Sequence, residues 1–246
     1  MKALTAELSK LISLPFFWVA CAAGLIVPNV IAIITSLSGS PGASIDTGFS
    51  ELSVGALGAI VLGGIAIGSE YVTEGEDSAG GQQITTSLIA IPSRIRLLMA
   101  KIGSIAISTL ILSIIAISSV LITFLLLNGP EVLTINADLF VRIIGVIVYW
   151  IFLALFSFSL TVLTRDAIIP ISVMVINSSG IAVTYLLTQV NPLATYLPDM
   201  AGQKMFTRSV DTGMELAPIA GGAIMGAWVL VLIIIAGITF LRRDVG

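Results

Sequence analysis

The chain has 246 residues, of which 57% are hydrophobic and only 10% are charged, whereas soluble domains carry about 25% charged residues. Too few polar side chains are available to cover a soluble core, so the composition indicates an integral membrane protein. The formal net charge is −3 and no basic domain stands out, which gives nucleic-acid binding no electrostatic basis. Histidine is absent and Cys21 is the one cysteine. We therefore expect no Ser-His-Asp triad, no metal site and no catalytic residue.

Residues 1–14 predict a short amphipathic helix that lies in the membrane interface. Its apolar residues recur at helical spacing at Met1, Leu4, Leu8 and Leu11. The charged residues lie off that stripe: Lys2, Glu7 and Lys10. The alternative is a solvated leader.

Six segments are long and apolar enough to predict membrane-spanning helices, which makes the expected fold an all-α polytopic membrane protein with one transmembrane domain over residues 1–246. The predicted spans are Phe16–Leu37, Leu52–Gly68, Ile102–Leu127, Leu139–Leu163, Ala167–Leu187 and Ala217–Leu241. The narrowest break, Leu163–Ala167, contains Arg165 and Asp166, which are too costly to leave in lipid.

The positive-inside rule predicts that both termini are cytoplasmic. The predicted cytoplasmic set is Lys2, Lys10, Arg94, Arg96, Lys101, Arg165, Arg242 and Arg243. The predicted outside set is Arg142, Lys204 and Arg208. Together they make up the 11 lysines and arginines of the chain.

Small residues at four-residue spacing predict close helix packing, either within one bundle or between subunits. They are Gly55, Ala59, Gly63, Gly64 and Gly68 in the second span, with Gly222 and Gly226 in the sixth. Polar residues inside spans must find a partner, so Asn29, Asn177 and Ser178 are candidates for a substrate path or for interhelical hydrogen bonds. Intramembrane carboxylates and a phosphate-binding GxxxxGK[ST] loop are not apparent, so we expect any energy to come from another chain.

Two loops are unusual. The loop over 70–101 begins with an acidic, glycine-containing stretch, continues as QQITTSLIA with helical spacing, and is broken at Pro92. We expect Arg94, Arg96 and Lys101 behind it to extend towards lipid phosphates. The alternative is a loop that is only positively charged. The second, 190–216, is predicted to be extracellular and either re-entrant or a plain loop.

These features resemble the permease subunits of type-2 ABC exporters. The likeness rests on Glu70 at the end of a span and on Gly81, Gln82, Ile84, Thr85, Leu88, Pro92, Arg94 and Lys101 after it. The segment with Asn191, Pro192, Tyr196, Leu197 and Pro198 is similar to the family's outer re-entrant region, and FLRRDV fits the chain end. Relatives often place the glycine-glutamine pair nearer the glutamate, whereas Tyr71–Gly80 intervene here.

The resemblance implies a multi-pass protein of the bacterial cytoplasmic membrane, paired with an identical or homologous permease and with two ABC ATPase subunits. ATP and Mg would bind those ATPases, with no cofactor on this chain. The residues implied in ATPase coupling are Glu70, Gln82, Gln83, Ile84, Thr85, Thr86, Ser87, Leu88, Pro92 and Arg94. The implied activity is export of an amphipathic drug, antimicrobial peptide or lipid. The alternatives are a secondary carrier or channel that works without an ATPase and, disfavoured by the missing histidines, a membrane enzyme.

Overall fold

The computed structural model describes residues 2–38, 45–71, 93–130, 135–178, 183–208 and 216–242, and every regular element in these ranges is a helix. The α-helices are α1 (Lys2–Ser13), α2 (Pro15–Leu37), α3 (Ile45–Gly55), α4 (Leu57–Tyr71), α6 (Arg94–Asn128), α7 (Ala137–Thr164), α8 (Ile168–Ser178), α9 (Val183–Val190), α10 (Pro198–Gln203) and α11 (Pro218–Arg242). A 3₁₀ helix, η2 (Pro192–Tyr196), precedes α10.

Five helical stretches are long and apolar enough to cross a membrane: α2, the α3–α4 pair over Gly48–Tyr71, α6, α7 and α11. The helices α8 and α9 pass the same test only together, and their axes differ by 57°. The predicted all-α fold is therefore confirmed, with five candidate spans, or six if the bent pair counts as one.

Three predicted spans differ from the structure. The second extends over Gly48–Tyr71 instead of Leu52–Gly68, and it is interrupted at Ala56. The third belongs to a helix that begins at Arg94, well before Ile102, because the Ser93 side chain caps it by accepting a hydrogen bond from the Arg96 amide at 3.4 Å. The fifth is bent, since α8 ends at Ser178.

The narrow break between the fourth and fifth spans lies where the sequence predicts it. The helix α7 ends at Thr164, and Arg165 takes a left-handed conformation with φ of 55°. Asp166 then accepts hydrogen bonds from the amides of Ile168 and Ile169, at 2.6 and 3.2 Å. A carboxylate on the first amides of a helix is a stabilising cap, so the two charged residues end one helix and begin the next.

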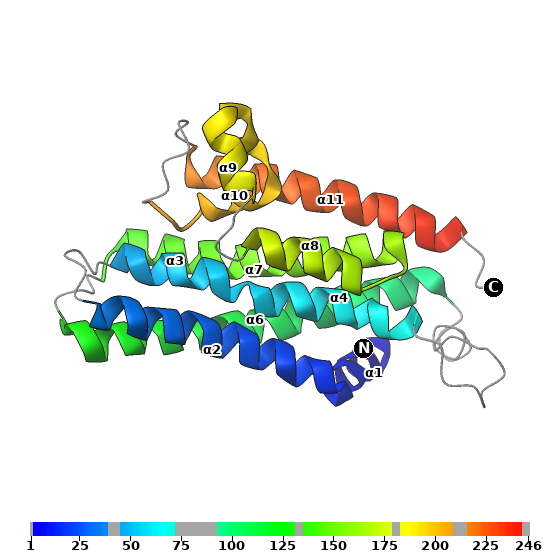
Figure 1. Cartoon of the computed structure of the whole chain (residues 1–246). Coiled ribbons are helices and arrows are strands. Elements are labelled where there is room, and N and C mark those ends of the chain that lie inside the picture. Colours follow the sequence, from blue (N-terminus) through cyan, green and yellow to red (C-terminus); the bar gives the residue numbers. More distant parts are fainter. Residues whose placement is uncertain are drawn as a thin grey trace.

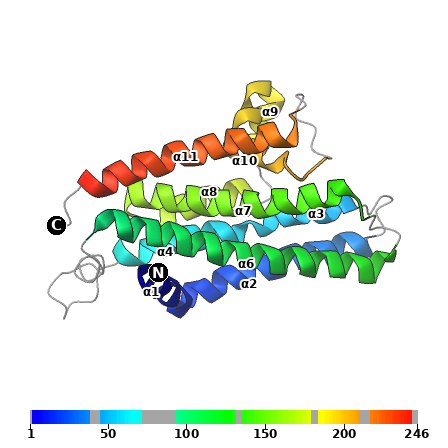
Figure 2. The ribbon, with the colours of Figure 1, turned by 180° about the vertical axis from the view of Figure 1, so that it is seen from behind.

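The long helices lie side by side, and α1 crosses one end of the bundle (Figure 1). That end is called the α1 end below. The helix α7 packs against α4, α6 and α11, while α2 packs against α4 and α6. The view from behind shows α6 and α7 along one side, with α9 and α10 gathered near the start of α11 (Figure 2). The stretch Gly48–Tyr71 has the largest share of buried residues among the five candidate spans, and its helix α4 contacts α2, α6, α7 and α8.

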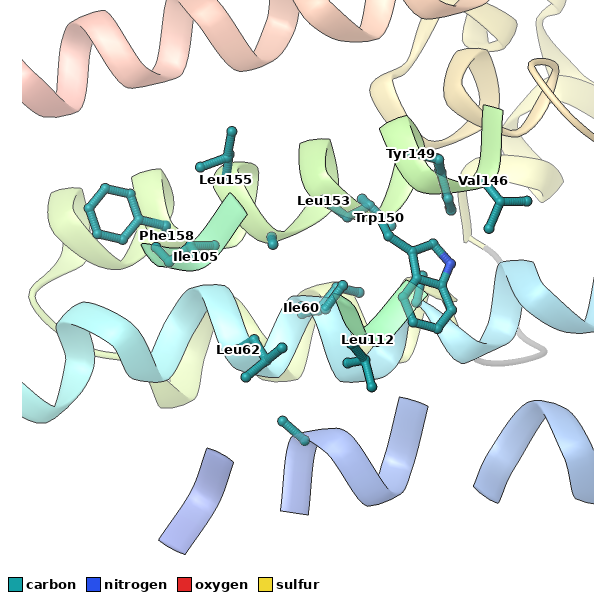
Figure 3. Close-up of a cluster of buried hydrophobic side chains, with 14 of the residues drawn as sticks. Ile60, Leu62, Ile105, Leu112, Val146, Tyr149, Trp150, Leu153, Leu155 and Phe158 are labelled. Atoms are coloured by element: carbon teal, nitrogen blue, oxygen red, sulfur yellow. The ribbon is translucent and has the colours of Figure 1, made fainter. Parts of the chain in front are cut away.

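The core lies along α4, α6 and α7. Figure 3 shows Ile60 of α4 near Leu112 of α6 and Trp150 of α7, with Leu62 further along α4. Large apolar side chains on α2, α6, α8, α9 and α11 point outward and are exposed, for example Ile34, Ile111 and Leu230. A helix bundle with an apolar exterior is suited to lipid and not to water.

The break between α3 and α4 is compensated by a side chain from α7. At the break the Ala56 amide turns to the Ser53 carbonyl, at 3.4 Å, so the Leu52 carbonyl loses its usual helical donor. The buried Trp150 indole nitrogen donates to that carbonyl at 3.0 Å. An unpaired carbonyl in a membrane interior is costly, so this hydrogen bond makes the interrupted helix tolerable.

Gly63 allows the closest contact between α4 and α7. A Cβ atom at this position would overlap the Ala154 carbonyl oxygen, which belongs to the α7 backbone and cannot move aside as a side chain could. A Cβ at Gly226 of α11 would instead meet only the Phe152 ring, at 3.4 Å. The two glycines therefore differ in the space available, although both lie within apolar helices.

We expect Gly63→Ala to destabilise the protein and Gly226→Ala to be neutral or mildly stabilising. Both changes gain about 1 kcal/mol of helix propensity, but overpacking against backbone costs about 1–3 kcal/mol at Gly63 only. Thermal unfolding of the purified variants in one detergent measures the difference. Equal melting temperatures would contradict the packing of α4 on α7.

Candidate functional site: the ion cluster

Four charged side chains from three helices meet at the α1 end of the bundle. They are Glu7 and Lys10 of α1, Glu70 of α4 and Lys101 of α6, called the ion cluster below. Lys101 Nζ lies 2.7 Å from Glu7 Oε2 and 2.7 Å from Glu70 Oε1, and Lys10 Nζ lies 2.6 Å from the same Glu70 oxygen. The cluster therefore joins α1 to the end of α4 and to the first turns of α6.

The centre of the ion cluster is almost fully buried. Glu70 is 0% exposed and Lys101 1% exposed. An ammonium group has three hydrogens, and Lys101 places them on Glu7, on Glu70 and on the Ala66 carbonyl at 3.1 Å. Two carboxylates balance two ammonium groups. Because buried charges are tolerated only when they are paired and hydrogen-bonded, each member depends on the others.

The direction predicted for the Lys101 side chain is wrong. We expected its side chain to extend towards lipid phosphates, but it points into the bundle, because two carboxylates and a carbonyl there replace its hydration. Glu7 is also buried, although it lies off the apolar stripe of the first helix. The helix α1 is present as predicted, and it packs on α6 and α2 as well as presenting an exposed face.

A cavity of about 10 Å³ adjoins the ion cluster, lined by Glu7, Lys10, Leu11, Leu14, Ala66, Ser69, Lys101 and Ser104. A cavity of this size is about the smallest that can hold one water. The buried Ser69 hydroxyl has no hydrogen-bond partner among the described residues, and it lines this cavity. A water in the cavity could therefore satisfy Ser69 and solvate the neighbouring charges.

Arg94 ties the start of α6 to the end of α11. Its Nη1 donates to the carbonyls of Phe240 and Leu241, at 3.3 and 3.4 Å. The last carbonyls of a helix lack internal donors and carry partial negative charge, so an arginine there is favourable. The chain before residue 72 is thus held by Glu70, and the chain after residue 92 by Arg94.

The remaining residues of the predicted coupling set lie outside the described residues. They are Gln82, Gln83, Ile84, Thr85, Thr86, Ser87, Leu88 and Pro92. Within the described ranges, no group of three or more Cys, Asp or Glu residues could hold a metal ion.

Two of the three residues proposed for a substrate path have polar partners in the described part of the chain. Asn29 of α2 donates to the Leu25 carbonyl at 2.7 Å and accepts from Thr123 of α6 at 2.9 Å, which is an interhelical hydrogen bond. Asn177 donates to Asp199 at 2.7 Å. The Ser178 hydroxyl oxygen is buried and has no partner among the described residues. The structure thus brings Asn177 and Ser178 together near the bend and places Asn29 in a different helix pair.

The glycines predicted for helix packing contact neighbours within this chain. Gly55 faces Pro28 and Trp150, Gly64 faces Ile171, and Gly68 faces Ala167. Ala59 is fully buried. Gly222 faces Met205, and Gly226 faces Phe152. These contacts correspond to the intra-bundle alternative left open by the sequence.

Arg142 makes a second charged contact, near the opposite end. Its side chain is buried, with Nη2 2.6 Å from Asp46 of α3 and Nε donating to the Phe206 carbonyl at 2.7 Å. The guanidinium lies 4.1 Å from the centre of the Phe49 ring. Arg142 therefore joins α7 to α3 and to the turn after α10.

Sequence reasoning missed the roles of Glu7, Lys10 and Asp199. The spacing of Glu7 and Lys10 predicts two charges near one another on a helix, but not which buried group they meet. A usable signal was Lys101 itself, since a lysine between apolar stretches has to find a carboxylate. Comparison with known protein families and with curated proteins finds no match for this chain.

We expect Lys101→Met to destabilise the protein by about 3–5 kcal/mol, because it leaves Glu7 and Glu70 with one cation between them. Lys10→Met should cost less, since the Lys10 side chain is 29% exposed. The double variant Glu7→Gln with Lys101→Met restores charge balance, and we expect it to be more stable than Lys101→Met alone. Chemical denaturation in detergent measures all three. A double variant less stable than the Lys101 variant would contradict charge pairing in the cluster.

Proposed function

We propose that this chain is the transmembrane permease subunit of an ATP-driven exporter of the type-2 ABC family, powered by a separate ATPase subunit. The single observation that carries the proposal is that the ion cluster fixes the end of α4, the first turns of α6 and α1 to one another, next to the two residues between which the segment 72–92 lies in the sequence. The sequence of the segment 72–92, between those fixed ends, supplies the resemblance to the family's coupling region.

The physical argument starts from the two anchored ends. A force on the segment 82–90 reaches Glu70 at one end and Arg94 at the other. From Glu70 it passes through Lys101 to Glu7, so α1, α4 and α6 move as a unit. From Arg94 it passes to the end of α11. Displacement of one short segment would therefore act on four helices at once, as coupling to an ATPase requires.

In this proposal the α1 end is cytoplasmic, as are both termini. The excess of lysine and arginine at the predicted inner loops supports this orientation, and the protein lies in the bacterial cytoplasmic membrane. Two permease copies, identical or homologous, pair with two ATPase subunits, which hold ATP and Mg. This chain carries out no hydrolysis. The exported substrate is amphipathic: a drug, an antimicrobial peptide or a lipid.

Co-purification with an ABC ATPase of the native host tests the proposal. We expect the tagged chain to retain that ATPase, and the pair of changes Ile84→Asp and Leu88→Asp to reduce retention at least about 10-fold. Ile135→Asp is the matched control, because Ile135 is a 76% exposed apolar residue at the opposite end of the bundle.

Two results would count against the proposal. One is that no ATPase is retained, or that the Ile84 and Leu88 changes act no more strongly than the Ile135 change. The other is substrate flux driven by an ion gradient in liposomes that contain this chain alone, which would favour a secondary carrier.

A further inference from the structure

Asp199 is a carboxylate held at the bend between α8 and α9. Its Oδ2 accepts a hydrogen bond from Asn177 of α8 at 2.7 Å and another from the Thr184 hydroxyl of α9. The Thr184 amide donates to Asn177 Oδ1 at 3.1 Å. The side chains of Asn177, Thr184 and Asp199 thus form one polar cluster between α8, α9 and α10, called the Asp199 site below. Figure 1 shows α8, α9 and α10 converging there.

The Asp199 site lies deep in the bundle. Asn177 follows the start of α8 at Ile168 by nine residues, or about 14 Å along the helix, which is about half of the hydrocarbon thickness. The helix α7 gives a second measure. A Cβ at Gly202 of α10 would lie 2.7 Å from the ring of Tyr149, near the middle of α7. Both measures place this carboxylate about half a membrane span from the start of α8, beside the middle of α7.

No cation of the described residues pairs with Asp199. The ion pairs in these ranges use other carboxylates: Lys10 and Lys101 bind Glu70, Arg142 binds Asp46, and Arg208 binds Asp138. The donors that reach Asp199 are a neutral amide and a neutral hydroxyl. A carboxylate at this depth is expensive without a countercharge, and such residues commonly mark a functional site.

The surface beside the Asp199 site is apolar. On α9 the side chains of Val183, Leu186 and Leu187 are 45%, 55% and 47% exposed, and Val190 at its end is 84% exposed. Asp199 itself is only partly buried. An approaching molecule would meet hydrocarbon-like side chains and one carboxylate. A molecule with an apolar body and a positive charge is complementary to both features.

We propose that Asp199, held by Asn177 and Thr184, binds the cationic group of an amphipathic ligand that enters beside α9. This inference deepens the proposed function and rests on it for the direction of transport, because it narrows the amphipathic substrate to a cationic one. Binding itself requires no ATPase. The carboxylate supplies the charge, the amide and the hydroxyl fix its orientation, and the apolar face of α9 accepts the body of the ligand.

Equilibrium binding of tetraphenylphosphonium to the purified full chain in a neutral detergent tests this site, with tetraphenylborate as an anion of similar size and shape. We expect saturable binding of the cation, and Asp199→Asn should weaken it at least about 10-fold. Asp199→Glu keeps the charge and should stay within about threefold of the parent. Asp138→Asn is the matched control, since it removes a carboxylate that already pairs with Arg208, and it should leave binding unchanged.

The thermal unfolding of each variant with and without the cation is measured in parallel. A structural role alone would lower the melting temperature of Asp199→Asn while leaving its affinity for the cation intact, and this would overturn the site. Equal binding of cation and anion by the parent chain, or no saturable cation binding, would also overturn it, even if Asp199→Asn does not fold.

The two proposals fail in different ways. If the chain binds the cation and the anion equally well but still retains the ATPase, the Asp199 site is wrong and the exporter proposal stands. If the cation binds at Asp199 but no ATPase is retained, the Asp199 site stands and the exporter proposal is wrong.

Discussion

The three hydrogen bonds of the Lys101 ammonium group constrain the whole α1 end of the bundle. A lysine seven residues into a mostly apolar helix can be accommodated in two ways, by reaching water or by meeting carboxylates. Here Glu70 and Glu7 come to it, from α4 and α1. The position of α1 follows from this requirement, because Glu7 can reach Lys101 only if α1 lies across the ends of α4 and α6. Lys10 then balances the charge.

The need of every buried polar group for a partner also explains two interruptions of the candidate spans. Where α3 ends, the Leu52 carbonyl loses its helical partner and takes the Trp150 indole in its place. Where α8 ends, Asn177 turns its side chain to Thr184 and Asp199. In both cases a side chain from a neighbouring element forms a hydrogen bond with a backbone group at the break. Such a replacement partner is the condition for non-regular backbone inside a membrane. The difference is that the Trp150 indole donates to a carbonyl at the first break, whereas at the second the Asn177 side chain accepts from the Thr184 amide and itself donates to the ionisable Asp199.

Packing contacts between helices connect the ion cluster with the Asp199 site. The ion cluster holds the end of α4, and α4 packs on α7 through the glycine contact at Gly63. The middle of α7 carries Tyr149, which α10 contacts through Gly202. Asp199 lies on the same short helix as Gly202. Since Gly63 packs on the α7 backbone and Gly202 packs closely on the Tyr149 ring, a shift of α4 would reach the Asp199 site through α7. This is the physical link between the proposed point of force and the proposed ligand site.

The sequence alone determined the helical class, the apolar segments and the boundary at Arg165 and Asp166, because hydropathy and capping are local properties. It also drew attention to Asn177, since a polar group inside an apolar run requires a partner, and to Glu70, Arg94 and Lys101 through the family resemblance. Only the tertiary structure decided which partners they have. Glu7 is 94 residues from Lys101 in the chain, and Arg94 is 146 residues from Phe240. Asp199 follows the predicted fifth span in a loop predicted to be extracellular, and it meets Asn177 and Thr184 only because α10 folds back against the bundle. Periodicity reports the face on which a residue lies, but the meeting of distant charges depends on how the helices pack.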